Sequence, residues 1–120
     1  MTLGGEVKRI GYSAFSYCTA LEEVKIPSGT ETIDGIAFLG CSSLENVDFS
    51  SAEKLKTIGI GAFGNCISLR RVELPENLKE IGQEAFYGCN ALVNVKIGSK
   101  VDSISANAFN YTPWYRENTR

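Results

Sequence analysis

IGIGAFGNCISL, residues 58–69, decides the fold, because the chain repeats this phrase at nearly constant intervals. Close copies occupy residues 10–21, 33–44 and 81–92, and a last, altered copy begins at residue 104. A chain that repeats one short unit builds its core by stacking the units on one another, because a single unit cannot bury its own apolar side. The repeat therefore predicts the architecture before any single residue is considered.

The centre of each unit is an Ala-Phe pair. Its phenylalanines follow one another at spacings of 23, 25, 23 and 23 residues: Phe15, Phe38, Phe63, Phe86 and Phe109. Three residues after each of the first four stands a cysteine: Cys18, Cys41, Cys66 and Cys89. A leucine, a valine and a further apolar residue then follow, as Leu69, Val72 and Leu74 do in the third full unit.

These positions have a direct physical reading. The alternation Leu-x-x-Val-x-Ile predicts a short extended segment with its apolar side chains on one face. Pro27 and Pro75 follow it directly in two units and end the strand. The Ala-Phe segment is too short for a full helix, so we expect a helical turn. The sequence predicts a right-handed solenoid with one parallel strand per coil of about 23 residues, on its inner face.

The repeat also divides the chain. We expect a single domain, residues 1–120, with a half unit at 1–9 and a C-terminal cap at 104–120 that contains Pro113, Trp114 and Tyr115. Full units begin at Ile10, Ile33, Ile58 and Ile81. The second is two residues longer, in SSAEKLKT, which predicts a bulge. Met1 and Leu3 fall on the Val and Ile positions, so the N-terminal half unit is either an improvised lid or a piece of a longer array; we favour the array. An uncovered apolar end could then self-associate.

Composition excludes several classes of function. The formal net charge is −2 and the basic residues are scattered among acidic ones, which argues against nucleic acid and anionic membranes as partners. No apolar run approaches the roughly 18–20 residues of a membrane span, so we expect no membrane insertion. The chain has no histidine, the commonest general base and transition-metal ligand. We therefore expect no catalytic residues, metal or cofactor.

The pattern I-G-x-x-A-F-x-x-C-x-x-L-x-x-V-x-I-P, which runs from Ile10 to Thr112, resembles the BspA-like class of leucine-rich repeats. The resemblance implies a leucine-rich repeat solenoid, a fragment of an α/β-type horseshoe. Members of that family are typically bacterial surface or secreted proteins linked to adhesion to host or neighbouring cells. The resemblance brings no catalytic residues with it.

The four cysteines could form disulfides, bind a metal or simply fill the core. Zinc sites prefer convergent ligands close in sequence, which a column of equivalent positions does not supply. Neighbouring coils would bring the α-carbons within range of a bridge, but parallel side chains keep the sulfurs a coil apart. We expect a buried column of free thiols that act as small hydrophobic residues.

The candidate binding surface is the exposed face of the strands. Its outward positions are Glu23, Lys25, Asn46, Asp48, Arg71, Glu73, Asn94 and Lys96. They predict a mixed-charge, hydrogen-bonding strip on a rigid support, which solenoids use to bind partners. We expect the partner to be a host matrix or cell-surface protein, with a glycan as the less favoured ligand. Tyrosines near the turns, such as Tyr12 and Tyr87, offer a second set of contacts.

Two other functions stay open. The repeats could be a structural spacer without a ligand of its own. Alternatively, Glu45 and Asp48, near Glu22 and Glu23, could act as paired carboxylates of a carbohydrate-active enzyme. Intervening basic residues and the usual solvation of surface carboxylates argue against the enzyme. The sequence favours a non-enzymatic interaction module.

Overall fold

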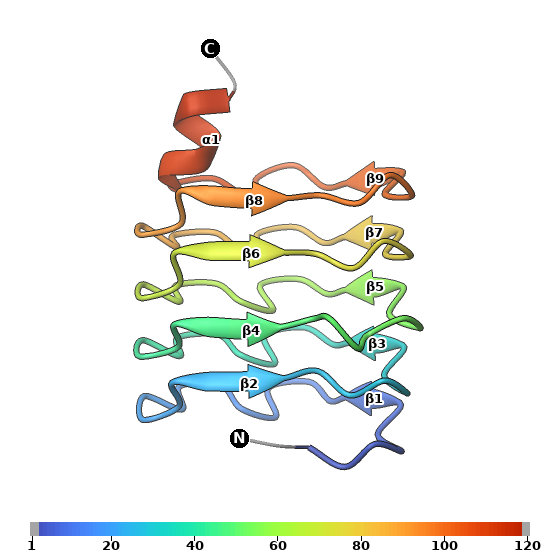
Figure 1. Ribbon diagram of the computed structural model, residues 1–120. Coiled ribbons are helices and arrows are strands. Elements are labelled where there is room, and N and C mark those ends of the chain that lie inside the picture. The colour runs from blue at the N-terminus through green and yellow to red at the C-terminus, as the bar shows by residue number, and fades with distance from the viewer. Residues whose placement is uncertain (1–2, 119–120) are drawn as a thin grey trace.

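The computed structural model describes residues 3–118, which form one stack of coils. Along its inner face runs one short strand per coil (Figure 1), and the valine at the centre of each strand is buried or half-buried. These strands are β2 (Glu23–Lys25), β4 (Asn46–Asp48), β6 (Arg71–Glu73) and β8 (Asn94–Lys96). Pairing is parallel and joins equivalent positions, with Val24 beside Val47 and Val72 beside Val95. The predicted solenoid with one inner strand per coil is confirmed.

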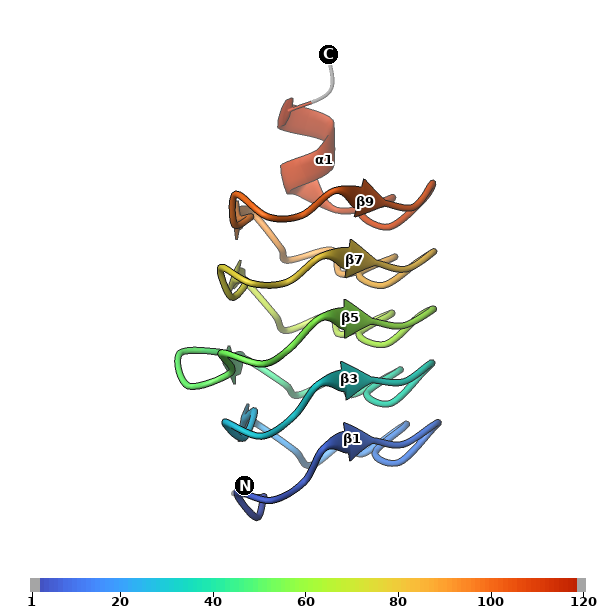
Figure 2. The same cartoon turned by 90° about the vertical axis from the view of Figure 1, so that its right-hand side faces the viewer.

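A second column of strands, which the sequence did not predict, lies on another side of the stack (Figure 2). Its members are β1 (Arg9–Ile10), β3 (Thr32–Ile33), β5 (Thr57–Ile58), β7 (Glu80–Ile81) and β9 (Ser103–Ile104). All five pair in parallel, and the isoleucine that opens each unit pairs with the isoleucine of the next. Two residues per coil are too few to produce the alternation that marks a strand in a sequence.

The Ala-Phe segments are turns, and the expected helical turn is not found there. Each pair is flanked by two residues with left-handed backbone angles, such as Ile36 (φ 46°) and Gly40 (φ 72°) around Ala37 and Phe38. A left-handed residue cannot continue a right-handed helix. The main chain bonds within each turn and also from coil to coil, as where the Phe38 N–H donates to the Ala62 carbonyl at 2.7 Å. Among the described residues, the helix α1 (Pro113–Asn118) is the one α-helix.

The phenylalanines form a column through the middle of the core. Their ring centroids lie 5.3, 5.1, 5.3 and 5.2 Å apart, and successive rings are nearly parallel. Phe38, Phe63 and Phe86 are completely buried, and the alanine before each leaves room for the neighbouring chain. The core is therefore a set of side-chain columns, one for each apolar position of the repeat.

The two ends of the stack differ. At the C-terminal end, Trp114 of α1 packs edge-on against Phe109, with ring centroids 5.0 Å apart. Thr112 begins this helix as its N-cap, because its hydroxyl accepts a hydrogen bond from the Tyr115 N–H at 3.0 Å. At the N-terminal end, Leu3 and Val7 are half-buried against the core. Met1, assigned above to the Val position, lies outside the described residues.

In three of the four full units a glycine follows the isoleucine that opens the unit: Gly11, Gly59 and Gly82. Glycine at this corner allows neighbouring coils to approach closely. A Cβ on Gly82 would lie 2.9 Å from the Gly59 carbonyl carbon and 2.9 Å from the Ile60 nitrogen. We expect Gly82→Ala to lower the free energy of unfolding by about 1–3 kcal/mol, because the main chain of the neighbouring coil must shift. Urea denaturation of the variant measures this loss.

Gly11 supplies the matched control, because it holds the same position in the first full unit and has no atom within 4 Å of a built Cβ. Gly11→Ala should leave stability unchanged or raise it slightly, by restricting the unfolded chain. Equal destabilisation by both substitutions would show that coil-to-coil approach is not the reason for glycine at this corner.

Candidate functional site

The structure places the eight candidate residues on one face of the molecule, the side of the inner strands that faces away from the core. Each strand carries two of them, on either side of its inward valine. Seven are exposed and Asp48 is half-buried. This face is not uniform, however, because the inner strands form two separate pairs.

The inner sheet is broken between β4 and β6. Parallel pairing joins β2 to β4 and β6 to β8, but no ladder joins β4 to β6 among the described residues. The second column of strands has no such break, since β3, β5 and β7 pair in succession. The two halves of the stack are therefore joined on one side and separated on the inner face.

The break leaves main-chain groups of both strands without their usual partners. The Ile26 N–H donates to Asp48 and the Leu74 N–H to Lys96, each at 2.9 Å, but the equivalent Phe49 N–H has no main-chain acceptor in the described chain. At the other end of the strand, the Glu22 and Arg70 carbonyls accept hydrogen bonds from the next coil. The corresponding bond from the Arg71 N–H to the Glu45 carbonyl is likewise absent within the described residues.

Two features of the second unit accompany this break. Its two additional residues form a turn after β4, in which the Ala52 N–H donates to the Phe49 carbonyl at 3.0 Å. Phe49 occupies the position of Ile26 and Leu74 in other units, and its larger ring packs edge-on against Phe63 at 6.1 Å. Extra length and extra volume on the inner side both hold the coils apart there.

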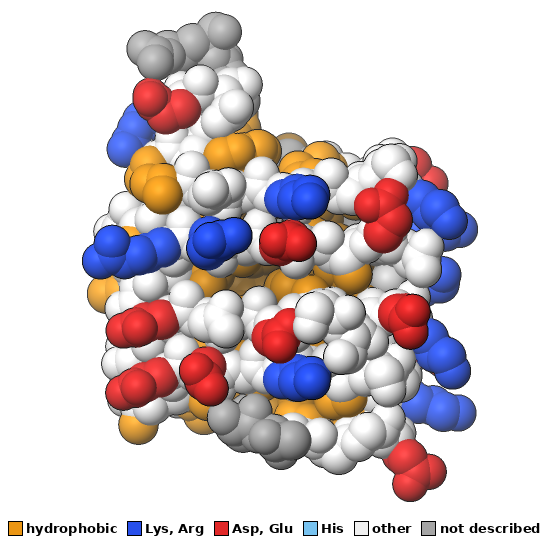
Figure 3. All heavy atoms as spheres, viewed as in Figure 1, with side chains coloured by type: hydrophobic (Ala, Val, Ile, Leu, Met, Phe, Trp, Pro, Cys, Tyr) orange, Lys and Arg blue, Asp and Glu red, His pale blue; other side chains and the backbone are white. Residues whose placement is uncertain are grey.

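A groove of about 780 Å³ lies over the break, between β4 and β6 and along the loops that follow them. We call it the β4–β6 groove. Its apolar lining includes Val47, Phe49 and Leu74, and polar side chains surround these residues. Figure 3 shows the face hollowed at this level, with apolar side chains inside the hollow.

The groove contains some of the residues expected from the sequence. Five of the eight candidates line it: Asn46, Asp48, Arg71, Glu73 and Lys96. Glu23, Lys25 and Asn94 lie outside its lining. Sequence reasoning missed Ser50, Glu53, Glu76 and Asn77, which come from the loops after the strands. The two-residue insertion was the available signal: the bulge expected there is present, as the loop before β5 protrudes beyond its neighbours (Figure 2), but the opening of the sheet was not expected.

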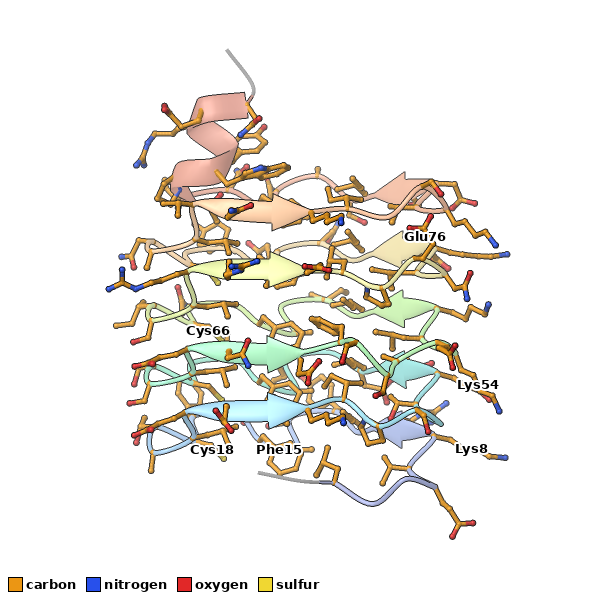
Figure 4. All side chains as sticks on the ribbon, viewed as in Figure 1. Lys8, Phe15, Cys18, Lys54, Cys66 and Glu76 are labelled. Atoms are coloured by element: carbon orange, nitrogen blue, oxygen red, sulfur yellow. The ribbon has the colours of Figure 1, made fainter. Side chains whose placement is uncertain are left out.

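Charge is distributed unevenly on this face. Acidic side chains gather beside β2 and β4, at Glu22, Glu23 and Glu45, and basic ones beside β6, at Arg70 and Arg71 (Figure 3). Hydrogen bonds from the Ser50 side chain and main chain lower the pKa of Asp48 below its ordinary value. Ser99 likewise lowers the pKa of Glu76, which projects from the loop after β6 (Figure 4). Both carboxylates are therefore ionised at neutral pH.

A second, smaller hollow of about 470 Å³ lies near the turns, beside β3 and β5. Its lining is largely apolar and includes Ile36, Tyr12 and Ile60. Tyr12 is 72% exposed and Ile60 is 57% exposed. Tyr12 is thus at the surface, whereas Tyr87 is half-buried and packs edge-on against Tyr111, with ring centroids 5.1 Å apart.

The cysteines are free thiols, and three of the four are completely buried. Each buried thiol donates a hydrogen bond to a phenylalanine carbonyl of the preceding coil: Cys41 to Phe15, Cys66 to Phe38 and Cys89 to Phe63, at 3.1, 3.3 and 3.0 Å. Burial raises the pKa of Cys41, and a hydrogen bond with Cys89 together with burial raises the pKa of Cys66. Cys18, half-buried, begins the column at the N-terminal end (Figure 4). The expected column of free thiols is confirmed.

Metal-ligating side chains are dispersed over the molecule. Within residues 3–118, His, Cys, Asp and Glu side chains nowhere form a group of three or more that could hold a metal ion. The same residues contain no helix with the length and apolar character of a membrane span.

Known proteins place this geometry in a family. The model of the BspA-type leucine-rich repeat region matches residues 1–114, with six copies. A leucine-rich repeat protein of T. pallidum is 31% identical, with a TM-score of 0.86, over 91% of this chain and 52% of its own. A leucine-rich cell surface protein of Faecalibacterium prausnitzii A2-165 is 32% identical, with a TM-score of 0.89, over 95% of this chain and 30% of its own.

A more distant solved structure is similar in fold only. The pneumococcal vaccine antigen PcpA is 20% identical, with a TM-score of 0.75, over 92% of this chain and 37% of its own. No curated protein matches the chain. The chain spans about half or less of the length of these solved structures. By its repeat pattern and the match over residues 1–114, this chain belongs to the family of BspA-type leucine-rich repeat proteins.

Proposed function

We propose that this chain is a non-enzymatic binding module of a bacterial cell-surface or secreted protein, and that it holds a partner protein on its inner face. The β4–β6 groove carries the proposal, because it combines an apolar interior with ionised and hydrogen-bonding side chains on a rigid support. A similar chain is described as a leucine-rich cell surface protein, which supports the location. Adhesion to host matrix or host cells is the role that fits both the groove and a location at the cell surface.

The alternatives have less support. A glycosidase needs a carboxylic acid whose pKa is raised, so that it can protonate the leaving group. The pKa of Asp48 is lowered instead, by its hydrogen bonds with Ser50, so Asp48 does not fit the role of that acid. A spacer domain needs no groove, and a continuous inner sheet would serve it better than one with unpaired main-chain groups.

The test is binding to a panel of matrix proteins, host cells and glycans. We expect saturable binding to one protein, measured by surface plasmon resonance. Simultaneous replacement of Arg71, Glu73, Asn94 and Lys96 by alanine should weaken it at least tenfold, because truncating several polar groups of one binding surface usually costs more than about 1.4 kcal/mol in affinity.

The control variant has matched chemistry in and beside the second column of strands. Its four alanine substitutions, at the exposed Lys56, Lys79, Glu80 and Gln83, also remove two cations, a carboxylate and an amide. It should bind like the unchanged chain. If both variants lose binding equally, the inner face is not the site, and if the unchanged chain binds no member of the panel, the spacer function is favoured.

A further inference from the structure

We propose that the β4–β6 groove takes an extended, basic polypeptide segment and holds it through main-chain hydrogen bonds. This names the ligand chemistry of the binding face and rests on the function proposed above. Three properties of the groove carry it: unpaired main-chain groups on both walls, an apolar lining with a polar surround, and an excess of carboxylates.

The unpaired main-chain groups call for a ligand with both donors and acceptors. Phe49 on the β4 wall and Arg71 on the β6 wall each present an N–H without a main-chain acceptor in the described chain. The Glu45 carbonyl lacks, among the described residues, the donor that its equivalents have. An extended peptide presents N–H and C=O groups along its length, as in peptides that add to the open edge of a sheet. It could therefore bond to the unpaired groups of either wall.

The shape and lining of the groove favour the same ligand. In an extended peptide, successive side chains point to opposite sides. One set would point inward, toward the apolar residues Val47, Phe49 and Leu74, which are no more than 5% exposed, while the other set would remain among the polar side chains above them. The volume of about 780 Å³ lies within the usual range of ligand-binding clefts.

Charge then specifies the side chains. The carboxylates of the lining are Asp48, Glu53, Glu73 and Glu76, against two cations, Arg71 and Lys96. Hydrogen bonds from serine keep Asp48 and Glu76 ionised. The excess of negative charge favours lysine or arginine at the outward positions of the peptide. A segment that alternates apolar and basic residues meets all three requirements.

The experiment measures binding of a capped octapeptide of alternating valine and lysine by isothermal titration calorimetry. The matched ligand is the same octapeptide with alternate main-chain nitrogens methylated, which keeps its charge but removes donors. We expect the methylated peptide to bind at least tenfold more weakly. On binding the unmethylated peptide, the Phe49 and Arg71 amide protons should exchange with solvent at least tenfold more slowly, as measured by NMR.

Two variants test the same contact from the side of the protein. Arg71→Pro removes the Arg71 N–H, and Arg71→Ala removes the same side chain but keeps the N–H. The proline variant should bind at least fivefold more weakly than the alanine variant, with a thermal melt as the check on folding. Because the methylated peptide needs no change in the protein, the test holds even if Arg71→Pro does not fold.

The outcomes separate this inference from the proposed function. Equal affinity for both peptides would mean that charge alone holds them, which overturns main-chain recognition. Binding of a hexameric glucose oligosaccharide in place of the peptide would overturn the ligand class. If the inner-face variant above loses its protein partner but neither peptide binds, the proposed function stands and this inference fails.

Discussion

Phe63→Ala should lower the free energy of unfolding by about 3–5 kcal/mol, the usual cost of removing a buried aromatic ring. Phe63 is completely buried, between Phe38 at 5.1 Å and Phe86 at 5.3 Å, with ring planes within 7° of each other. Phe49 contacts the same ring edge-on at 6.1 Å. Main-chain bonds at the Ala-Phe turns, from Phe38 to Ala62 and from Phe63 to Ala85, keep the coils from closing around the cavity, so urea denaturation would measure nearly its full cost.

Phe15→Ala is the matched control, because Phe15 begins the same column. Its ring is half-buried and stacks on one neighbour, Phe38, at 5.3 Å. We expect it to cost no more than roughly half as much as Phe63→Ala, because less apolar surface leaves the core. A denaturation midpoint unmoved by Phe63→Ala, or an equal shift for both variants, would contradict the stacked column.

The repeat made the main architecture predictable. A strictly spaced Ala-Phe pair, cysteine, leucine and valine can all be buried at once only if equivalent positions stack in register. The structure has this register, as the pairing of Val24 with Val47 and of Ile33 with Ile58 shows. Burial of Cys41, Cys66 and Cys89 follows from the same logic, since equivalent positions in coils that have a neighbour on each side share one environment.

What the sequence did not reveal depends on small differences between coils. The Ala-Phe segments were expected to be helical turns, but the residue before each pair has a left-handed backbone angle, which nothing in the sequence requires of Ile36. The thiol-to-carbonyl bonds, such as that from Cys66 to Phe38, depend on side-chain rotamers. These bonds join residues of neighbouring coils and follow from the three-dimensional arrangement of the coils.

The candidate site was only partly predictable, for a related reason. Outward positions of a strand follow directly from its alternation, so the face itself was found. Its groove arises because Phe49 and the inserted residues hold β4 and β6 too far apart for main-chain pairing. The insertion predicted the bulge before β5 (Figure 2), but only the structure shows that the sheet is also open beside it.

The second large effect is expected at the C-terminal end, where Trp114→Ala should lower the free energy of unfolding by about 2–4 kcal/mol. The Trp114 ring packs on Phe109, which is only 3% exposed, and the main-chain N–H of Trp114, which alanine keeps, donates to the Leu92 carbonyl at 2.9 Å. Removing the ring uncovers the last layer of the core, and a solenoid needs that surface covered. Urea denaturation followed by circular dichroism measures the loss.

Arg116→Ala, in the same helix, is the control, because Arg116 is exposed and should contribute no more than about 0.5 kcal/mol. Terminal coils contact one neighbour, so the damage should begin locally. In Trp114→Ala, amide exchange should quicken first around Phe109 and later around Phe63. If amide exchange quickened equally throughout the stack, the helix would stabilise the chain as a whole. That result would contradict the prediction that each coil is stabilised mainly by its neighbours.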